Sequence, residues 1–448
     1  MTGLRLAHSL SWIGLAFAAQ QITRLGTNVL LALIVSPSVF GVMLILNTLR
    51  TGVEQITDVG IGQNIVFDPR GNQPDFYNTA WTIQILRGVL LFAAFLALSP
   101  VIDRSFGEGE LGPLLPMFAT IFIITGFATP GMFLLQKNAQ VKTIVGIELL
   151  IAIIGGATAI GFALISPTAT ALVWALLAST AAGAMLFAAT MNWRSLRTQM
   201  NREMAWTIVG YGKWVFLSTL LYFAATSFDR LYLAAVVPLS VLGVYGVART
   251  FSEAAFQLAH KVATLLIFPS VSSAHHDGKG VGELAEHRSR GLLIAAVLIG
   301  VGIGVTEPVI LALYDERYEA AAYILPILLA GSWFSIIAVL NEAVVFGKGK
   351  PALNAGANGL KFLWLLVTVP AVFVQAGLGW TVVMIALADV ARYIVLAGTA
   401  LEHKVRFFLQ DMLATLLVVV AFIVTRLAIV SVGLSEALLP LDPAHLSF

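Results

Sequence analysis

The sequence predicts an all-α polytopic membrane protein with two six-helix lobes in a pseudo-twofold repeat around a central cavity, plus an extra C-terminal helix. Three observations predict this fold: the composition, a series of long apolar runs and an internal repeat. Of the 448 residues, 58% are hydrophobic and only 11% are charged. Soluble domains contain about 25% charged residues, so the composition excludes a soluble protein.

Two further counts narrow the chemistry. The chain contains no cysteine, which excludes disulfide bonds, thiolate catalysis and cysteine-ligated metals. The formal net charge is +2, so charge alone gives no reason to expect a nucleic-acid partner.

The apolar runs are long enough to cross a membrane, and they divide the chain into thirteen predicted spans. Twelve of them fill two blocks of six, and the thirteenth lies outside this scheme. The tail after Ser431 contains Pro440 and Pro443 and is too short for a fourteenth span. The predicted spans are 11–35, 38–66, 77–100, 113–136, 141–165, 168–191, 206–237, 240–270, 290–313, 321–346, 352–375, 378–400 and 409–431.

Basic loop residues predict the orientation of these spans. Loops after even-numbered spans, together with the N-terminus, carry fourteen Lys and Arg residues, Arg288 among them, whereas loops after odd-numbered spans carry only Arg104 and Arg317. Because basic residues concentrate on the cytoplasmic side, we expect a multi-pass membrane protein with a cytoplasmic N-terminus. The outer loops are short or acidic, as at Asp315 and Glu316.

An internal repeat lies in the first hairpin of each predicted half. Residues 31–42 read LALIVSPSVFGV and residues 233–244 read LAAVVPLSVLGV, with seven of twelve positions identical at an offset of 202 residues. Chance similarity between two apolar runs is the alternative. Six spans per copy give parallel copies related by an axis along the membrane normal. The predicted organisation is an N-terminal lobe at 1–191, a cytoplasmic linker at 192–205, a C-terminal lobe at 206–400, and an extra helix with its tail at 401–448.

Many basic residues fall inside the predicted spans, where each charge costs about 2.5–3.5 kcal/mol at mid-helix. Polar and basic residues of one span share a helix face, for example Gln20, Arg24 and Asn28 at i, i+4 and i+8. Arg24 and Arg87 have no acidic residue within one turn on their own helices. The predicted cavity is therefore cationic, and guanidinium groups suit phosphate or carboxylate. The predicted substrate-binding residues are Arg24, Asn28, Arg50, Arg87, Arg230 and Arg249.

Acidic residues inside the spans are candidates for ion coupling, with H⁺ or Na⁺ as the candidate ion and no other cofactor expected. The alternative is that the charges only hold helices together, because Arg50–Glu54, Arg249–Glu253 and Asp389–Arg392 are spaced for pairing along one helix. The coupling or ion-pair candidates are Glu54, Asp58, Asp229, Glu253, Asp389 and Arg392.

Other charged residues are expected to reach solvent at helix ends. They are Lys213, Lys261, Lys361, Arg426, Glu148 and Glu342. His275 and His276 form a pair without a third ligand nearby, so no metal site is expected there. No phosphate-binding loop and no catalytic motif of a hydrolase is present, so no catalytic residue is expected.

Short motifs in both halves carry a family resemblance. Residues 227–233 read SFDRLYL, and residues 240–248 read SVLGVYGVA, which gives an Asp-Arg pair followed by Leu-Gly-x-Tyr-x-x-Ala. With residues 37–41, 58–62 and 377–380 and the pair Lys350-Pro351, the chain resembles the polysaccharide (lipid-linked oligosaccharide) flippases of the multidrug/oligosaccharidyl-lipid/polysaccharide exporter superfamily. Members commonly have 12 or 14 spans, so thirteen predicted spans depart from the family pattern.

This resemblance implies a flippase that moves an undecaprenyl-pyrophosphate-linked oligosaccharide across the inner membrane by alternating access, for assembly of a surface polysaccharide such as an exopolysaccharide or O-antigen. It implies a monomer among membrane lipids, with a polysaccharide polymerase and a chain-length regulator as partners. The family's cationic cavity corresponds here to Arg24, Arg50, Arg87, Arg230 and Arg249.

Two other functions stay open. An ion-coupled multidrug or small-solute antiporter of the same superfamily has the same fold and differs only in its site. A polytopic glycan ligase or lipid-linked sugar transferase needs a sizeable loop for its acceptor, and the predicted loops are all short.

Overall fold

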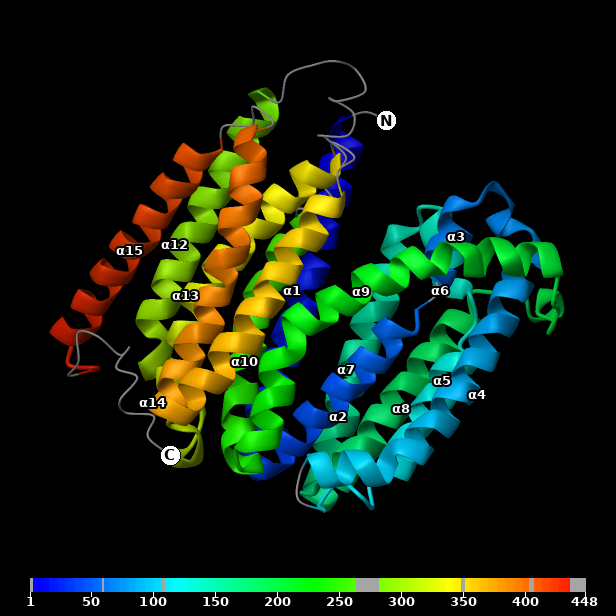
Figure 1. Cartoon of the computed structure of the whole chain (residues 1–448), viewed down its shortest axis with the longest axis horizontal. Coiled ribbons are helices and arrows are strands. Elements are labelled where there is room, and N and C mark those ends of the chain that lie inside the picture. Colours follow the sequence, from blue (N-terminus) through cyan, green and yellow to red (C-terminus); the bar gives the residue numbers. More distant parts are fainter. Residues whose placement is uncertain are drawn as a thin grey trace. The chain divides into compact units, whose positions relative to one another are not determined.

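The computed structural model describes residues 3–58, 60–106, 109–262, 282–347, 351–402 and 407–435, and in these ranges it contains helices and turns but no strand (Figure 1). Seven of the described helices are long and apolar enough to cross a membrane, or eight if one bent pair counts as a single span. The predicted class, an all-α polytopic membrane protein, is confirmed.

The packing of the chain divides it into two units. Unit 1 comprises Met1–Leu220 and Ala234–Gly243, and unit 2 comprises Leu221–Leu233 and Val244–Phe448. Helices α9 (Arg202–Val236) and α10 (Leu239–Val262) contribute to both. The predicted lobe boundaries at 191, 205 and 400 stay a prediction.

Unit 1 is built from helices that pack mainly on their neighbours in sequence: α4 lies along α5, α7 along α8, and α1 along α7. Phe76 and Ile65 are fully buried in its core, against Ile208 near the start of α9. Its other elements are α1 (Gly3–Ile34), α2 (Pro37–Ile56), α3 (Ile61–Phe67), η1 (Pro69–Asn72), α4 (Pro74–Ser105), α5 (Leu115–Phe127), α6 (Gly131–Lys137), α7 (Val141–Ile165), α8 (Ala169–Ala188) and η2 (Trp193–Ser195).

Two predicted spans of unit 1 are interrupted. The span predicted at 38–66 breaks after α2, and α3 restarts behind Gly60, whose φ of 71° is easily adopted only by glycine. The span predicted at 113–136 forms α5 and α6, which meet at an angle of 45° around Pro130. The apolar runs predicted the lengths but not these breaks, because hydropathy does not report backbone direction.

The predicted linker at 192–205 is held along α4. The Asn78 amide donates to the carbonyl of Ser195 at 2.9 Å, and the backbone N–H of Asn201 donates to the Thr79 hydroxyl at 3.2 Å. The Asn201 side chain then accepts from the N–H of Glu203 at 3.0 Å, which satisfies an otherwise unpaired donor at the start of α9. The polar face at the start of α4 therefore gives this extended segment a fixed path.

The two copies of the repeat turn contact each other inside unit 1. A Cβ at Gly41 would lie 2.1 Å from the carbonyl oxygen of Leu239, and a Cβ at Gly243 would lie 1.8 Å from that of Pro37. Gly41 and Gly243 are equivalent positions of the repeat. Only glycine permits such a close approach, so the two copies pack on each other through the same residue.

Unit 2 is centred on α13 (Ala321–Gly347), which packs along α14 (Pro351–Glu402) and α12 (Gly282–Leu313) and is the most buried of the membrane-span candidates. The spans predicted at 352–375 and 378–400 form one helical run, α14, with a break at Gly377, where φ is 76°. The predicted extra span is helix α15 (Phe408–Ser431), which lies along α12 (Figure 1). A short turn, η4 (Glu316–Tyr318), separates α12 from α13.

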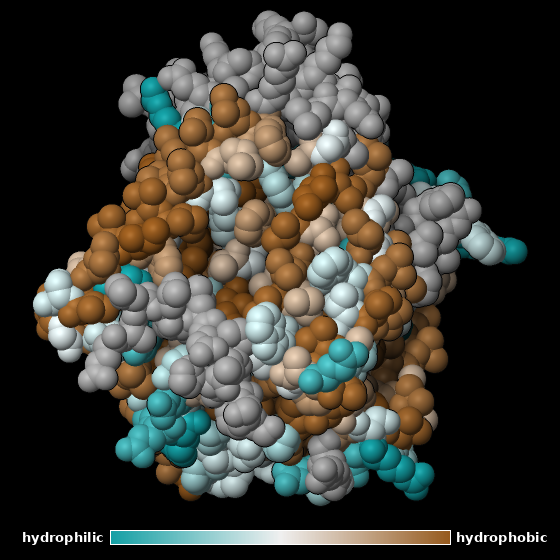
Figure 2. Space-filling view, turned by 60° about the vertical axis from the view of Figure 1, so that its left-hand side comes forward, coloured by the Kyte–Doolittle hydropathy of each residue, from teal (hydrophilic) through white to brown (hydrophobic). Residues whose placement is uncertain are grey.

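Apolar side chains also cover the outside of the helices. Leu416 and Val424 on α15 and Leu298 on α12 are about half exposed or more. Figure 2 shows a face on which hydrophobic residues predominate and hydrophilic residues gather mainly toward its lower edge. Such a surface is costly in water and is expected of helices that face lipid.

Candidate functional site

The first candidate region lies in unit 1, at the end of α2 and on α4. We name it the α2–α4 polar cluster; it comprises Arg50, Glu54, Thr57, Asp58 and Arg87. Arg50 and Glu54 form an ion pair of 3.0 Å along one turn of α2, and their side chains are 22% and 33% exposed. Asp58 accepts from the N–H of Gly60 at 2.9 Å, which shapes the break before α3.

Arg87 is the cation that α4 adds to this cluster. Its guanidinium donates to the backbone carbonyl of Glu54 at 2.5 Å and to the Thr57 hydroxyl at 2.9 and 3.0 Å. Within the described residues, no carboxylate oxygen forms an ion pair with Arg87. The Arg87 charge is thus held by neutral acceptors, and Glu54 and Asp58 act on it only through space.

Arg24 and Asn28, the other predicted binding residues of unit 1, lie partly buried on α1, which packs along α7. Close contact between the two helices is visible at Gly156, where a Cβ would lie 2.5 Å from the Thr27 hydroxyl. The role of Arg24 and Asn28 stays a prediction.

The second candidate region lies in unit 2, where α9 and α10 face each other. We name it the α9–α10 polar cluster; it comprises Asp229, Arg230, Tyr245, Arg249 and Glu253. Arg230 pairs with Glu253, and Arg249 lies 3.6 Å from Asp229 and 3.4 Å from Glu253. Asp229 is 1% exposed and accepts from the Tyr245 hydroxyl at 2.5 Å. Each arginine of this cluster therefore has a carboxylate partner.

The third region, the α13–α14 polar cluster, comprises Ser335, Glu342, Asn354, Lys361, Asp389 and Arg392. Lys361 pairs with Asp389 at 2.5 Å, and Arg392 pairs with Glu342. Asp389 also accepts from the Ser335 hydroxyl, and Glu342 accepts from the Asn354 amide at 2.7 Å. The pairs join residues that are 28 and 50 positions apart in sequence, so they fasten different helical segments together.

These two clusters of unit 2 influence each other electrostatically. Lys361 lies close enough to Asp229 and Arg249 for their charges to interact, and Asp389 lies close enough to Arg249. Four cations meet four carboxylates across both clusters, so the charges balance. The cations are Arg230, Arg249, Lys361 and Arg392, and the carboxylates are Asp229, Glu253, Glu342 and Asp389.

Several sequence predictions about these charges are wrong. Lys361 and Arg426 were expected to reach solvent, but they are 6% and 1% exposed and are paired with Asp389 and Glu307. Glu342 binds Arg392 instead of facing solvent.

The expected pairing of Asp389 with Arg392 is replaced by pairs with Lys361 and Glu342. Spacing along one helix cannot reveal a better partner on another. The predicted pairs Arg50–Glu54 and Arg249–Glu253 are confirmed. The side chains of Lys213 and Lys261, and residues His275 and His276, lie outside the part of the chain that the structure describes.

Arg288 was counted as a loop residue but lies in α12, 4% exposed, with an ion pair of 2.6 Å to Asp411. Sequence reasoning also missed Asp411 and Glu307 as partners of buried arginines. One signal was available: each is an acid inside an apolar run, and such a charge requires a partner.

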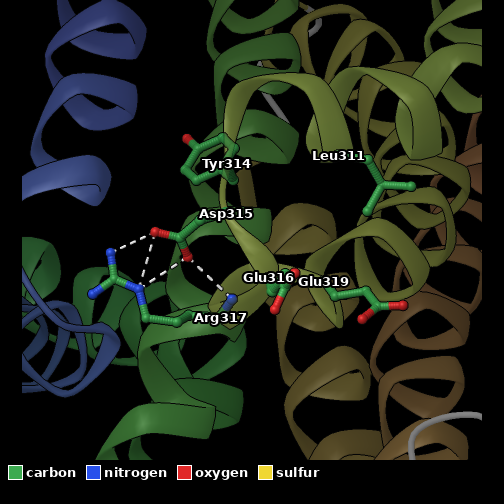
Figure 3. Close-up of a pocket in the computed structure, with 6 residues that line it drawn as sticks. All are labelled: Leu311, Tyr314, Asp315, Glu316, Arg317 and Glu319. Carbon is green, nitrogen blue, oxygen red and sulfur yellow. Dashed lines mark hydrogen bonds and ion pairs between the residues drawn. The ribbon is translucent and has the colours of Figure 1, made fainter.

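A separate hollow of about 520 Å³ lies at the turn between α12 and α13, lined by Leu311, Tyr314, Asp315, Glu316, Arg317 and Glu319 (Figure 3). The Arg317 guanidinium turns toward Asp315 and donates to its carboxylate at 2.5–3.0 Å. These hydrogen bonds hold the pKa of Asp315 below its usual value. Burial raises the pKa of the neighbouring Tyr318 hydroxyl. That this turn lies on the outer side of the membrane stays a prediction.

Over the described residues, no group of three or more His, Asp or Glu side chains is arranged to hold a metal ion.

The fold is that of known membrane transporters. The structure superposes on the lipid II flippase MurJ in an inward closed conformation with a TM-score of 0.72 and 12% sequence identity, over 94% of this chain and 98% of that one. It superposes on the inward-facing conformation of a multidrug resistance MATE family transporter of the MOP superfamily with a TM-score of 0.66 and 14% identity, over 93% and 96% of the two chains. Both similarities show the fold alone.

The chain belongs to the polysaccharide biosynthesis protein family, whose model matches residues 30–323. It is 21% identical over 307 residues to the teichuronic acid biosynthesis protein TuaB of Bacillus subtilis (strain 168). The matched region covers 66% of this chain and 62% of that protein. It is 19% identical over 317 residues to the amylovoran biosynthesis protein AmsL of Erwinia amylovora, covering 70% and 81%. The predicted family is confirmed.

Proposed function

We propose that this polysaccharide biosynthesis membrane protein is a flippase that moves an undecaprenyl-pyrophosphate-linked oligosaccharide across the inner membrane by alternating access. The family membership and the transporter fold support this proposal. So do the relatives, which are named for the biosynthesis of teichuronic acid and amylovoran.

The observation that carries the proposal is the environment of Arg87. Its hydrogen bonds go to a carbonyl and a hydroxyl, so its positive charge is not cancelled by a bonded carboxylate. A pyrophosphate is a stronger acceptor for a guanidinium than either neutral group, because it carries negative charge and can accept two parallel hydrogen bonds from the guanidinium fork. Arg50, whose side chain is partly exposed, would supply the second cation when Glu54 releases it.

The proposal gives the remaining predicted residues two roles. Arg24 and Asn28 would join Arg50 and Arg87 in binding the anionic head group. Asp229, Glu253, Asp389 and Arg392 in unit 2, with Glu54 and Asp58 in unit 1, would couple transport to H⁺ or Na⁺. Because Arg230 and Arg249 are ion-paired with carboxylates, they would bind substrate only when those carboxylates are protonated or occupied by a cation.

The test is complementation of a strain that lacks this gene. Arg87→Gln and Arg24→Gln should abolish surface glycan and leave the lipid-linked oligosaccharide on the cytoplasmic leaflet, while membrane insertion stays normal. Arg70→Gln is the matched control, because Arg70 is paired with Asp68 and Glu203 outside the polar clusters. Normal glycan export by both Arg24→Gln and Arg87→Gln would overturn the cationic-site proposal.

The same strain separates the alternative functions. The MATE-like fold is compatible with a small-solute antiporter, which would change drug resistance and leave surface glycan untouched. A polytopic transferase would turn over the lipid-linked glycan as a purified protein, whereas the proposal expects no enzymatic activity. Co-purification would test the proposed polymerase and chain-length partners, and reporter fusions would test the cytoplasmic N-terminus.

A further inference from the structure

The extra helix α15 is joined to α12 by two ion pairs of buried arginines, one toward each end of their contact. Arg288 pairs with Asp411 at 2.6 Å, and Arg426 pairs with Glu307 at 2.8 Å. Each helix thus contributes one arginine and one acid. Between the pairs the backbones approach closely, since a Cβ at Gly300 would lie 2.5 Å from the carbonyl oxygen of Val418.

The two ends of this contact differ in what else they touch. Asp411 accepts from the Asn341 amide on α13 and from the Tyr393 hydroxyl on α14, each at 3.2 Å. Arg288 donates to Asn341 as well, at 3.0 Å. We name these four residues the Asp411 network. It joins α12, α13, α14 and α15 through side chains that are all buried.

At the opposite end, hydrogen bonds join α12, α15 and the turn after α15. Glu307 accepts from Arg426 and from the Ser435 hydroxyl, both at 2.8 Å, and Arg426 also donates to the carbonyl of Gly304. These hydrogen bonds fasten α15 to α12, and Glu307 also lies within electrostatic range of Tyr323 at the start of α13. The two ends are therefore a natural pair for comparison: both join the same two helices through an arginine and an acid, and the Asp411 end adds hydrogen bonds to Asn341 on α13 and Tyr393 on α14.

The position of the Asp411 network along α13 and α14 is the decisive detail. Asn341 precedes Glu342, and Tyr393 follows Arg392, and Glu342 and Arg392 bind each other. Adjacent residues of an α-helix point about 100° apart. Asp411 therefore fixes the rotation of both helices from one side, while the Glu342–Arg392 pair forms on another.

We propose that the Asp411 network makes α15 a positioning element, which sets the geometry of the Glu342–Arg392 pair in the α13–α14 polar cluster. Asp411, Arg288, Asn341 and Tyr393 are positioning residues that act through the helices that carry that pair. The inference rests on the proposed function only where the effect is measured as transport. It gives the thirteenth span a task beyond anchoring.

The test replaces each ion pair by apolar residues of similar size, which avoids leaving a buried charge unpaired. The network variant is Arg288→Met with Asp411→Leu, and the matched control is Arg426→Met with Glu307→Leu. The probe is His260→Cys, because His260 is exposed and lies within electrostatic range of Glu342 and Arg392. The chain has no native cysteine, so this thiol is the sole site of labelling.

The readout is the ratio of labelling rates with a cationic and an anionic methanethiosulfonate reagent, measured on purified protein. The ratio reports the local potential at position 260. We expect the network variant to change it and glycan export by about 2- to 30-fold, the range seen for residues that couple distant sites. The control should change neither by as much as twofold. Equal effects of the two variants, or none from the network variant, would overturn the proposal.

A second variant keeps the test decisive if the network variant does not fold. Tyr393→Phe removes only the hydroxyl that reaches Asp411 and preserves packing. It should shift the labelling ratio in the same direction by a smaller factor, and an unchanged ratio in a folded Tyr393→Phe protein would contradict the positioning role. A shifted ratio in a protein whose wild type exports no glycan would support the positioning and reject the proposed function.

Discussion

The polar clusters of the two units use the same residue types in different ways. In unit 1, the ion pair of the α2–α4 polar cluster lies on one helix and is partly exposed, and Arg87 is bonded to neutral acceptors. In unit 2, Lys361 and Asp389 are 8% and 7% exposed, and the pairs of the α13–α14 polar cluster join separate helical segments. The charges of unit 2 are thus part of how its helices are held, whereas in unit 1 the Arg87 guanidinium is hydrogen-bonded to a carbonyl and a hydroxyl.

The largest expected effect is the loss of one partner of a buried pair in unit 2. Asp389→Leu would leave Lys361 buried without a counter-charge and should lower the free energy of unfolding by about 3–5 kcal/mol. Thermal unfolding of the purified protein in detergent measures it. Lys361→Met added to Asp389→Leu should restore most of the stability, and a single variant as stable as the wild type would break the comparison.

A second prediction concerns the contact between the repeat copies. Gly41→Ala and Gly243→Ala each place a Cβ against a backbone carbonyl and should cost about 1–3 kcal/mol of unfolding free energy, as overpacking does. Because the two glycines are equivalent, the two costs should be similar. Gly26→Ala is the control: nothing lies within 4 Å of its Cβ position, so a small gain in stability is expected. A tolerated Gly41→Ala would show that the contact is loose.

A smaller effect is expected in unit 1. Glu54→Gln breaks a partly exposed pair along one helix turn and should change the free energy of unfolding by less than about 1 kcal/mol. The same thermal measurement applies. If Glu54→Gln destabilised the protein as much as Asp389→Leu, the charges of both units would be equally structural.

The smallest effect is expected at the turn between α12 and α13. Arg317 lowers the pKa of Asp315. The pair therefore stabilises the turn fully at a pH above the usual pKa of a carboxyl group, and this stabilisation is lost as the pH falls through the lowered pKa. The pair is exposed, so the effect on stability stays below about 1 kcal/mol. Titration of the Asp315 carboxyl by NMR should give a lowered midpoint in the wild type and a higher one in Arg317→Gln.

The sequence was sufficient to predict where the long helices lie, because a membrane span requires high hydropathy over a fixed length of chain. It could not locate the breaks at Gly60 and Gly377, where a single backbone angle redirects the chain. It found the charged residues of the clusters, and spacing along one helix was enough for Arg50–Glu54 and Arg249–Glu253.

The remaining partners depend on helix packing. Lys361 and Arg426 were placed at helix ends, but their acids lie on other helical segments, and Arg288 was assigned to a loop because α12 begins before the apolar run does. Pairing between helices is a property of the tertiary fold, and a single sequence contains no direct signal for it.

The most direct test of the proposed anion site is flipping by the purified protein in liposomes. Vesicles would contain an undecaprenyl-pyrophosphate-linked oligosaccharide, and its exposure on the opposite leaflet would be followed over time. The wild type and Arg70→Gln should equilibrate the lipid at similar rates. Arg87→Gln should be slower by about tenfold or more, as the loss of a charge-assisted hydrogen bond predicts. Equal rates for Arg87→Gln and the wild type would contradict the account.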